Sequence, residues 1–272
     1  MFSLQKIPVT LCFILLSVSS NAGDPHLMPA GAAQAGMAYV SVMRNDFWSA
    51  FHNQAALAGK RRFSAGISYE NRFGLAELGT TTAAFQLPAG KTGLGIICSR
   101  FGYHDYNRNF FAAACGLPVA ENLTAGVQVD YLEEHSRGDY TPFRTITFEA
   151  GIQGTIGENT RFGVHLFNPL PSSLRKYKMV SIINAGAGTN LTDRFFAGVE
   201  GELRSDGRGD IRTGFEYSAK KDIVIRGGFH TRNSSFCFGI GYRLKGLRTD
   251  ISFSTHNKLG ISTSVTFTYD IN

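Results

Sequence analysis

The sequence predicts an all-β protein, a transmembrane, antiparallel, up-and-down β-barrel of about 14 strands with a small N-terminal plug inside its lumen. Three observations predict this fold. Long stretches alternate between apolar and polar residues, the polar positions carry charges of both signs, and turn-forming residues recur along the chain. A charged face cannot fill a dry core, so the apolar face must meet lipid and the charged face a wet lumen.

Alternation with a period of two is clearest toward the C-terminus. Residues 261–270 place Ile, Thr, Val, Phe and Tyr at every second position, with Ser, Thr and Asp between them. Residues 211–218, 236–245 and 247–254 repeat this pattern. Successive side chains of a β-strand point to opposite faces, so the period predicts strands with one apolar and one polar face.

The polar face of the predicted strands carries acidic and basic side chains. They are Asp130, Glu200, Glu202, Arg204, Arg212, Glu216, Arg226, Arg243, Arg248 and Asp250. On neighbouring strands such charges can pair across the wall of the lumen. We expect them to face the lumen, as an ordinary polar lining, as a selectivity surface or as a socket for the plug.

Turn-forming residues divide the chain into strands of about ten residues, which is enough to cross a membrane at a tilt. Tight turns are predicted at 88–91, 118–122, 157–160, 190–193, 219–222 and 245–246, and more polar connections at 71–77, 102–108, 134–141, 168–177, 205–209, 231–235 and 256–258. Strands therefore run from about Arg62–Glu70 to about Leu259–Ile271. An even strand count places both termini and the tight turns on the periplasmic side.

The N-terminus has the features of a secretory signal. Lys6 precedes an apolar run at 7–18, and Ser20-Asn21-Ala22 fits a cleavage site, so residues 1–22 are predicted to be a cleaved signal peptide. The run is short for a membrane-spanning helix. The exported barrel, residues 62–272, is expected in the bacterial outer membrane with outer-membrane lipid around it. A net charge of +6 does not imply nucleic acid as a partner of an exported protein.

Residues 23–61 do not alternate and are predicted to form the plug. A fourteen-strand lumen is too wide for the side chains of its own wall to fill. The single tryptophan, with Phe47 and Phe51 beside it, favours burial in the lumen over a disordered periplasmic tail. The plug residues expected to matter are Gly36, Met37, Tyr39, Asp46, Trp48, Asn53 and Leu57.

Cysteine and histidine spacing gives no sign of catalysis. Cys98 and Cys115 lie about equally far from a turn near 106–107, so they could face each other across two strands. A disulfide and a pair of small apolar residues both fit that arrangement. No histidine pair has metal-ligand spacing, and Gly-x-Ser-x-Gly is absent. We therefore expect no catalytic residues, no metal and no cofactor.

The N-terminal segment also resembles a known signature. Residues 30–42, Ala-Gly-Ala-Ala-Gln-Ala-Gly-Met-Ala-Tyr-Val-Ser-Val, and 46–58, Asp-Phe-Trp-Ser-Ala-Phe-His-Asn-Gln-Ala-Ala-Leu-Ala, are similar to the N-terminus of FadL-like outer-membrane β-barrels, most of all the PorV/PorQ family of Bacteroidetes-type bacteria. Gln54 replaces the family's usual Pro and Ala56 its usual Gly. The family's fourteen-strand barrel with an N-terminal plug agrees with the strand count above.

The resemblance implies competing functions, all non-enzymatic. The PorV/PorQ resemblance implies a partner-binding role in type IX protein secretion or surface attachment, with secretion-system proteins as partners. The FadL resemblance implies instead a passive channel for a hydrophobic small molecule, and a structural envelope barrel is a third alternative. Short predicted loops and a charged lumen favour the first, since FadL-like channels build an external hydrophobic site from long loops. The C-terminal Asp270-Ile271-Asn272 lacks the terminal aromatic residue common in outer-membrane proteins.

Overall fold

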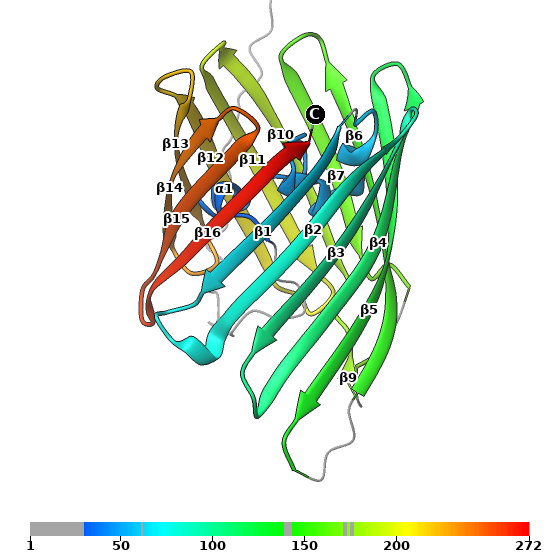
Figure 1. Ribbon diagram of the computed structural model, residues 1–272, viewed down its shortest axis with the longest axis vertical. Helices are drawn as coiled ribbons and strands as arrows, with labels where there is room; N and C mark the ends of the chain where they lie inside the picture. Colours follow the sequence, from blue (N-terminus) through cyan, green and yellow to red (C-terminus); the bar gives the residue numbers. More distant parts are fainter. Residues whose placement is uncertain (1–29, 61, 139–142, 171–172, 175–176, 272) are drawn as a thin grey trace, which may run out of the picture.

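The structure is a computed structural model that describes residues 30–60, 62–138, 143–170, 173–174 and 177–271. The predicted signal peptide, residues 1–22, lies outside the described residues. Fourteen strands form a closed antiparallel barrel (Figure 1). The predicted antiparallel barrel and its strand count are therefore confirmed. None of the helices in the described part of the chain is long and apolar enough to cross a membrane.

Each barrel strand pairs with its neighbours in the chain, because a short connection lets an antiparallel strand return beside the one before it. The strands are β1 (Phe63–Asn71), β2 (Gly79–Ala89), β3 (Thr92–Gly102), β4 (Tyr106–Ala120), β5 (Leu123–Ser136), β6 (Phe143–Ile156), β7 (Thr160–Phe167), β10 (Ile182–Thr192), β11 (Phe195–Arg204), β12 (Gly209–Ser218), β13 (Ile223–His230), β14 (Ser235–Leu244), β15 (Leu247–His256) and β16 (Gly260–Ile271). β1 pairs with β16 and closes the barrel.

The connections fall into two classes at the two ends of the barrel. Tight turns such as Lys245-Gly246 lie at the end where β1 begins and β16 ends, which we call the tight-turn end. The other end, the loop end, carries the longer connections, including η4 (Ala76–Leu78) and a short hairpin of β8 (Ser173–Leu174) and β9 (Tyr177–Lys178). β4, β5 and β6 have 15, 14 and 14 residues, whereas β11 to β15 have 8 to 10. Figure 1 shows the long strands extending beyond the others at the loop end.

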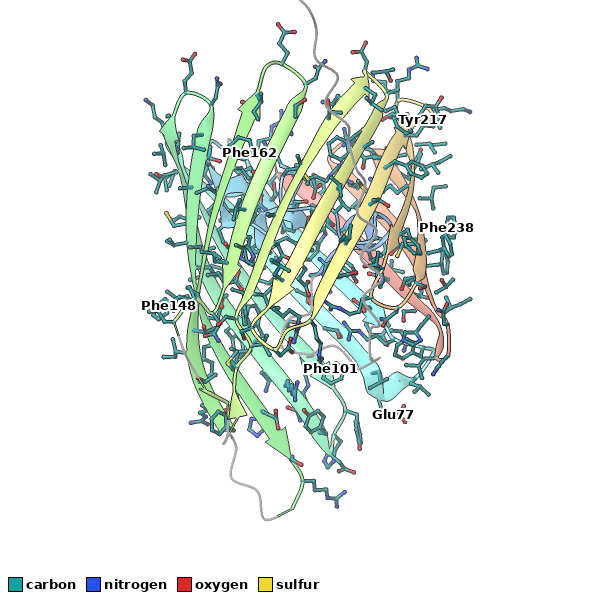
Figure 2. All side chains as sticks on the ribbon, turned by 180° about the vertical axis from the view of Figure 1, so that it is seen from behind. Glu77, Phe101, Phe148, Phe162, Tyr217 and Phe238 are labelled. Atoms are coloured by element: carbon teal, nitrogen blue, oxygen red, sulfur yellow. The ribbon has the colours of Figure 1, made fainter. Side chains whose placement is uncertain are left out.

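The outside of the barrel is apolar. Alternate residues of the strands project away from the barrel, as Phe148 and Phe238 do on opposite sides in Figure 2, and these two side chains are 45% and 58% exposed. Only lipid can cover so many exposed apolar side chains, and a closed barrel leaves no backbone hydrogen-bonding group unpaired along its edges. This is the architecture of a bacterial outer-membrane protein.

Residues 30–60, here called the N-terminal segment, lie inside the barrel (Figure 1). The segment contains α1 (Ala32–Ala35), η2 (Trp48–Phe51) and η3 (Gln54–Leu57). α1 packs against β14, β15 and β16, and η3 packs against β3, β4, β5 and β6. Small residues let these short helices approach the wall closely, and Asn53 caps η3 by accepting a hydrogen bond from the Ala55 amide.

The two cysteines that could have faced each other do not. In the register of the barrel Cys98 lies opposite Phe111, and Cys115 lies opposite Leu94. Both cysteines are free. The disulfide alternative is therefore wrong. The register of β3 against β4 is shifted from the one that would place the two cysteines opposite each other, and spacing around a turn does not determine that register.

Candidate functional site

The wall of the lumen over β11 to β16 is rich in ion pairs, and we call it the charged half. Arg226, whose side chain is 1% exposed, lies between two carboxylates, 2.7 Å from Glu216 and 2.8 Å from Asp250. Asp250 also binds Arg248, at 2.9 Å. A buried guanidinium is stable only where carboxylates compensate its charge, so these residues form one linked chain of charges.

A second cluster of the charged half lies nearer the loop end. Arg212 binds Asp210 at 3.0 Å and Glu200 at 3.6 Å, and it also contacts Glu202. Arg232, from the connection between β13 and β14, contacts Glu202 as well. Arg204 pairs with Asp206 at 3.3 Å. Most of the charges predicted to line the lumen therefore neutralise one another within the wall.

The N-terminal segment joins this charge chain. Arg44 binds Glu216 of β12 at 2.9 Å and Asp46 of its own segment at 3.0 Å. Burial alone would raise the pKa of Asp46, but Arg44 and Arg248 lower that pKa well below its usual range. Asp46 also accepts a hydrogen bond from the Ser49 amide at the start of η2. The segment is thus held to the charged half by fully ionised groups.

Backbone amides of the segment are held by a carboxylate of the wall. Glu200 Oε2 accepts hydrogen bonds from the amides of Ser41, at 2.8 Å, and Val42, at 2.9 Å. From the other side, Gln153 Nε2 of β6 donates to the carbonyls of Val42, at 2.7 Å, and Arg44, at 3.0 Å. A short stretch of irregular backbone inside the lumen is therefore hydrogen-bonded from both walls, as buried backbone must be.

Two amide side chains of the segment contact the opposite wall. Asn53 Nδ2 donates to the carbonyls of Val42 at 2.8 Å and of Ile152 in β6 at 3.0 Å. Gln54 Nε2 donates to Glu149 and, at 3.3 Å, to Gln128. Gln128 in turn donates to Asp130 at 2.8 Å. Gln54 and Asp130 therefore belong to one buried polar network, which the sequence did not connect.

Glycines of the wall have no side chain, so the N-terminal segment packs directly against the backbone of the strands. Gly198, Gly214 and Gly228 lie side by side on β11, β12 and β13, and Gly93, Gly116, Gly126 and Gly151 lie side by side on β3 to β6. A Cβ atom at Gly214 would lie 2.5 Å from the Met37 carbonyl oxygen. The second row faces Leu57, Gln54 and Asn53 in the same way. We call the two rows the glycine rows.

Sequence reasoning missed the glycine rows, although a signal for them exists. Strand openings after the tight turns repeat a similar pattern, with a glycine at positions 126, 163 and 198. That pattern repeats because the same height of the barrel wall meets the segment on several strands. Gly36, a predicted segment residue, lies against another glycine, Gly239 of β14.

Two aromatic side chains complete the contacts of the segment. The rings of Tyr39 and His52 stack with centroids 6.2 Å apart, and the Tyr39 hydroxyl donates to Glu70 of β1 at 3.3 Å. His52 hydrogen-bonds the Ser41 hydroxyl and the Ala30 carbonyl, each at 2.8 Å. Burial lowers the pKa of His52 to about 4, so the ring is neutral in the folded protein at neutral pH.

The opposite part of the lumen, over β2 to β5 with the loop ends of β6, β7 and β10, is more apolar, and we call it the apolar half. Midway along it, Trp48, which is 2% exposed, packs with Ala84, Ile97 and Ala112. Phe47 and Phe51 of the segment pack against the same cluster, with rings 5.8 Å apart. Leu57 packs nearby with Ala50, Ala56 and Ala114.

A second apolar cluster fills the loop end of this half. It contains Leu132, Phe167, Met179 and Ile182, with Phe143 and Val180 packed against it. Phe110 of β4 packs against both clusters. The apolar half therefore presents a continuous apolar track, from the loop end to the N-terminal segment. In the described residues no group of three or more His, Cys, Asp or Glu side chains could hold a metal ion.

Two hollows lie outside these contacts. One, of about 590 Å³, opens at the tight-turn end, and Arg243 and Arg248 are among the residues that line it. The other, of about 460 Å³, lies on the wall of β11 to β14, where Gly227 has no side chain between the rings of Phe215 and Phe238. Arg243 therefore lines the hollow at the tight-turn end and takes part in none of the ion pairs described above.

Comparison with known proteins shows likeness in structure. No protein-family model matches the sequence, and no curated protein matches it. The fold is similar to that of a Pseudomonas aeruginosa FadL homologue, with a TM-score of 0.67 at 12% identity over 89% of this chain and 98% of the other. The fold is also similar to that of the Pseudomonas putida toluene transporter TodX, with a TM-score of 0.67 at 10% identity over 89% of this chain and 98% of the other.

A TodX mutant, described as a monoaromatic hydrocarbon channel, gives a TM-score of 0.69 at 11% identity over 90% of this chain and all of the other. These structures are FadL-type outer-membrane barrels, so this chain shares their fold. Identities this low show the fold alone. The resemblance of residues 30–58 to the PorV/PorQ family stays a prediction.

Proposed function

We propose that the barrel is a passive channel through which small hydrophobic compounds cross the outer membrane along the apolar half of the lumen. The observation that carries this proposal is the position of Phe110. Its ring packs against the apolar cluster at the loop end and against the Trp48 cluster at the N-terminal segment. A hydrophobic solute moving from the loop end inward would therefore stay in contact with apolar side chains.

The apolar track is filled with side chains in this structure, and the N-terminal segment lies at its inner end. We infer that residues 23–61 act as the plug, and that a solute advances by displacing flexible or ring-shaped side chains such as Met179 and Phe110. Methionine suits this role because its unbranched thioether adapts to irregular contacts. The charged half stays in place meanwhile, since its ion pairs fix the other side of the segment.

The structural neighbours support this reading. A toluene transporter and a monoaromatic hydrocarbon channel share the fold at TM-scores of 0.67 and 0.69. Met179 and Val180, which lie between β9 and β10 at the loop end, also belong to the apolar cluster, so a connection outside the barrel strands supplies part of the apolar track.

The test is uptake by cells with an intact outer membrane, whose outer leaflet slows hydrophobic solutes. Cells with and without the protein are given radiolabelled toluene or a radiolabelled sugar of similar size. We expect the protein to accelerate toluene uptake and to leave sugar uptake unchanged, because the N-terminal segment is bound to the charged half of the lumen and closes it to polar solutes. Equal toluene uptake in both strains, or faster sugar uptake, would contradict the proposal.

A second candidate is the partner-binding role in secretion or surface attachment. One structural observation favours it: the many contacts of Arg44, Glu200 and Asn53 make the barrel and its segment one fixed body, as a docking platform requires. Chemical cross-linking in cells, followed by purification of the barrel, tests this role. Recovery of the same secretion components in repeated experiments would support it, and recovery of the barrel alone would count against it.

A further inference from the structure

The hollow at the tight-turn end lies between the N-terminal segment and the ends of β1, β2, β14, β15 and β16. Five cationic side chains line it: Lys60, Arg62, Arg243, Lys245 and Arg248. Two carboxylates, those of Asp46 and Asp270, also line it. A hollow lined mainly by charges of one sign concentrates counter-ions within it.

Both carboxylates are already engaged. Asp46 binds Arg44 at 3.0 Å and accepts a hydrogen bond from the Ser49 amide at 3.1 Å. Asp270 accepts a hydrogen bond from the Ser64 hydroxyl at 2.7 Å. The Ser64 hydroxyl is neutral and leaves the charge of Asp270 in place, but Asp46 is already paired with Arg44, so the five cations still outnumber the carboxylates that can compensate them.

Most of the cations lack a carboxylate partner of their own. Arg62, Arg243 and Lys245 form no ion pair and no side-chain hydrogen bond with any residue that the structure describes. Arg248 binds Asp250, but that carboxylate is shared with Arg226. The hollow is thus lined by cations with unused hydrogen-bond donors, and three of these cations have no partner within the described ranges.

The strand register adds an independent observation. Arg243 of β14 lies directly opposite Arg248 of β15. Like charges in directly opposed positions of an antiparallel pair destabilise the sheet. Lys60 approaches the same hollow, where its ammonium donates to the Asn45 carbonyl at 2.7 Å and burial lowers its pKa. An anion between these groups would remove the repulsion.

We propose that this hollow is a binding site for a phosphate group, with Arg243, Arg248 and Lys60 as its principal ligands. Guanidinium groups match the geometry of phosphate oxygens and form paired hydrogen bonds with them, and a lysine adds a point charge. A volume of about 590 Å³ accommodates a phosphate with a further substituent, so a phosphomonoester or a phospholipid headgroup also fits. The site does not depend on the channel proposal, because it lies outside the apolar track.

The test uses the purified full barrel in a maltoside detergent, titrated with inorganic phosphate by calorimetry. We expect binding that weakens as sodium chloride is added, as for any exposed charge interaction. The variant Arg243→Gln should weaken phosphate binding by about tenfold or more, the scale of one lost charge-assisted contact. Heat-modifiable migration on gels shows whether each variant has folded.

Arg161 supplies a matched control. It is the second residue of β7 at the same tight-turn end, it does not line the hollow, and it has no ion pair with a described residue. Arg161→Gln should leave phosphate binding unchanged. If wild-type barrel binds no phosphate, or if both variants lose binding equally, the site assignment is overturned.

The source of the phosphate is decided by repeating the titration in lipid nanodiscs. In phosphatidylglycerol nanodiscs a headgroup that reaches the hollow would compete with added phosphate, whereas in maltoside no headgroup is present. If the wild-type barrel loses phosphate binding in the nanodiscs and regains it on return to maltoside, the site is assigned to lipid. Binding that is equal in both media assigns it to a soluble phosphate compound.

Discussion

The two halves of the lumen are built on opposite principles. The charged half, on β11 to β16, consists of short strands whose buried charges pair with one another and with Arg44 of the N-terminal segment. The apolar half contains the long strands β4 and β5, and its side chains form a track joined by Phe110. The N-terminal segment contacts both halves, by ion pairs in the charged half and by apolar packing in the apolar half. Only the apolar half supplies the track along which we propose that hydrophobic solutes pass.

The two halves also differ in how readily they can change. A buried ion pair is geometrically demanding, and loss of one partner leaves an uncompensated charge. An apolar cluster tolerates rearrangement, because its contacts are individually weak and non-directional. Movement of a solute is therefore expected on the apolar side, and the predictions below separate the two halves by disturbing each in turn.

The largest effect is expected from breaking the charged half. Arg226→Gln leaves Glu216 and Asp250 without their buried partner, so we expect it to lower the free energy of unfolding by about 3–5 kcal/mol. Urea unfolding of the refolded barrel, followed by heat-modifiable migration, measures the change. Arg137→Gln is the control, since it breaks an exposed pair with Asp105 and should not alter stability measurably. Equal unfolding curves for both variants would show that the buried ion pairs of Arg226 do not contribute to the free energy of unfolding.

A smaller effect is expected where the segment touches a glycine row. Gly214→Ala places a Cβ atom 2.5 Å from the Met37 carbonyl oxygen, and the backbone must move, at a cost of about 1–3 kcal/mol. The only tryptophan, Trp48, reports this movement, because its emission shifts to the red when the segment leaves its buried position. Gly201→Ala on β11 is the control, with its nearest neighbour, the Ala185 oxygen, 3.9 Å away. A Trp48 spectrum that Gly214→Ala leaves unchanged would contradict the close packing of the segment.

The smallest effect concerns pH. The pKa of buried His52 is about 4 against an ordinary value of 6.5, so the undocked segment binds more protons as the pH falls below 6.5. Docking is therefore fully stable above pH 6.5 and weakens by about 1 kcal/mol between pH 6.5 and 5.5. The urea midpoint of Trp48 emission at the two pH values measures this shift. His52→Gln should reduce the shift, and an undiminished shift would assign the pH dependence to other groups.

Much of the barrel could be predicted from the sequence because the pattern that indicates a strand lies within a few consecutive residues. The alternation over residues 261–270 and the turn at Lys245-Gly246 are short-range features, and both mark real elements of the structure. Pairing across the molecule is not local. The positions of Cys98 and Cys115 in the sequence are compatible with a bridge, but the register of β3 against β4 places another residue opposite each of them.

The candidate site was only partly accessible to sequence reasoning for the same reason. Arg44 and Glu216 are 172 residues apart, and nothing in the chain between them indicates that they form an ion pair. Phe110 follows the polar residues Asn107 to Asn109, which resemble a loop more than a strand that lines an apolar track. The charges of the lumen were predicted only as a set, and the division into two halves depends on which strands become neighbours.

The channel proposal depends on Phe110 more directly than on any other side chain, and toluene uptake by intact cells producing two Phe110 variants tests it. Phe110→Ala removes the ring that joins the two apolar clusters and should raise uptake, because it leaves space along the track. Phe110→Asp places a charge there and should lower uptake, because a hydrophobic solute would have to displace the water around that charge. Opposite changes in two variants that reach the outer membrane in equal amounts are the predicted result. Uptake that is the same in wild type and both variants would contradict the assignment of passage to the apolar half.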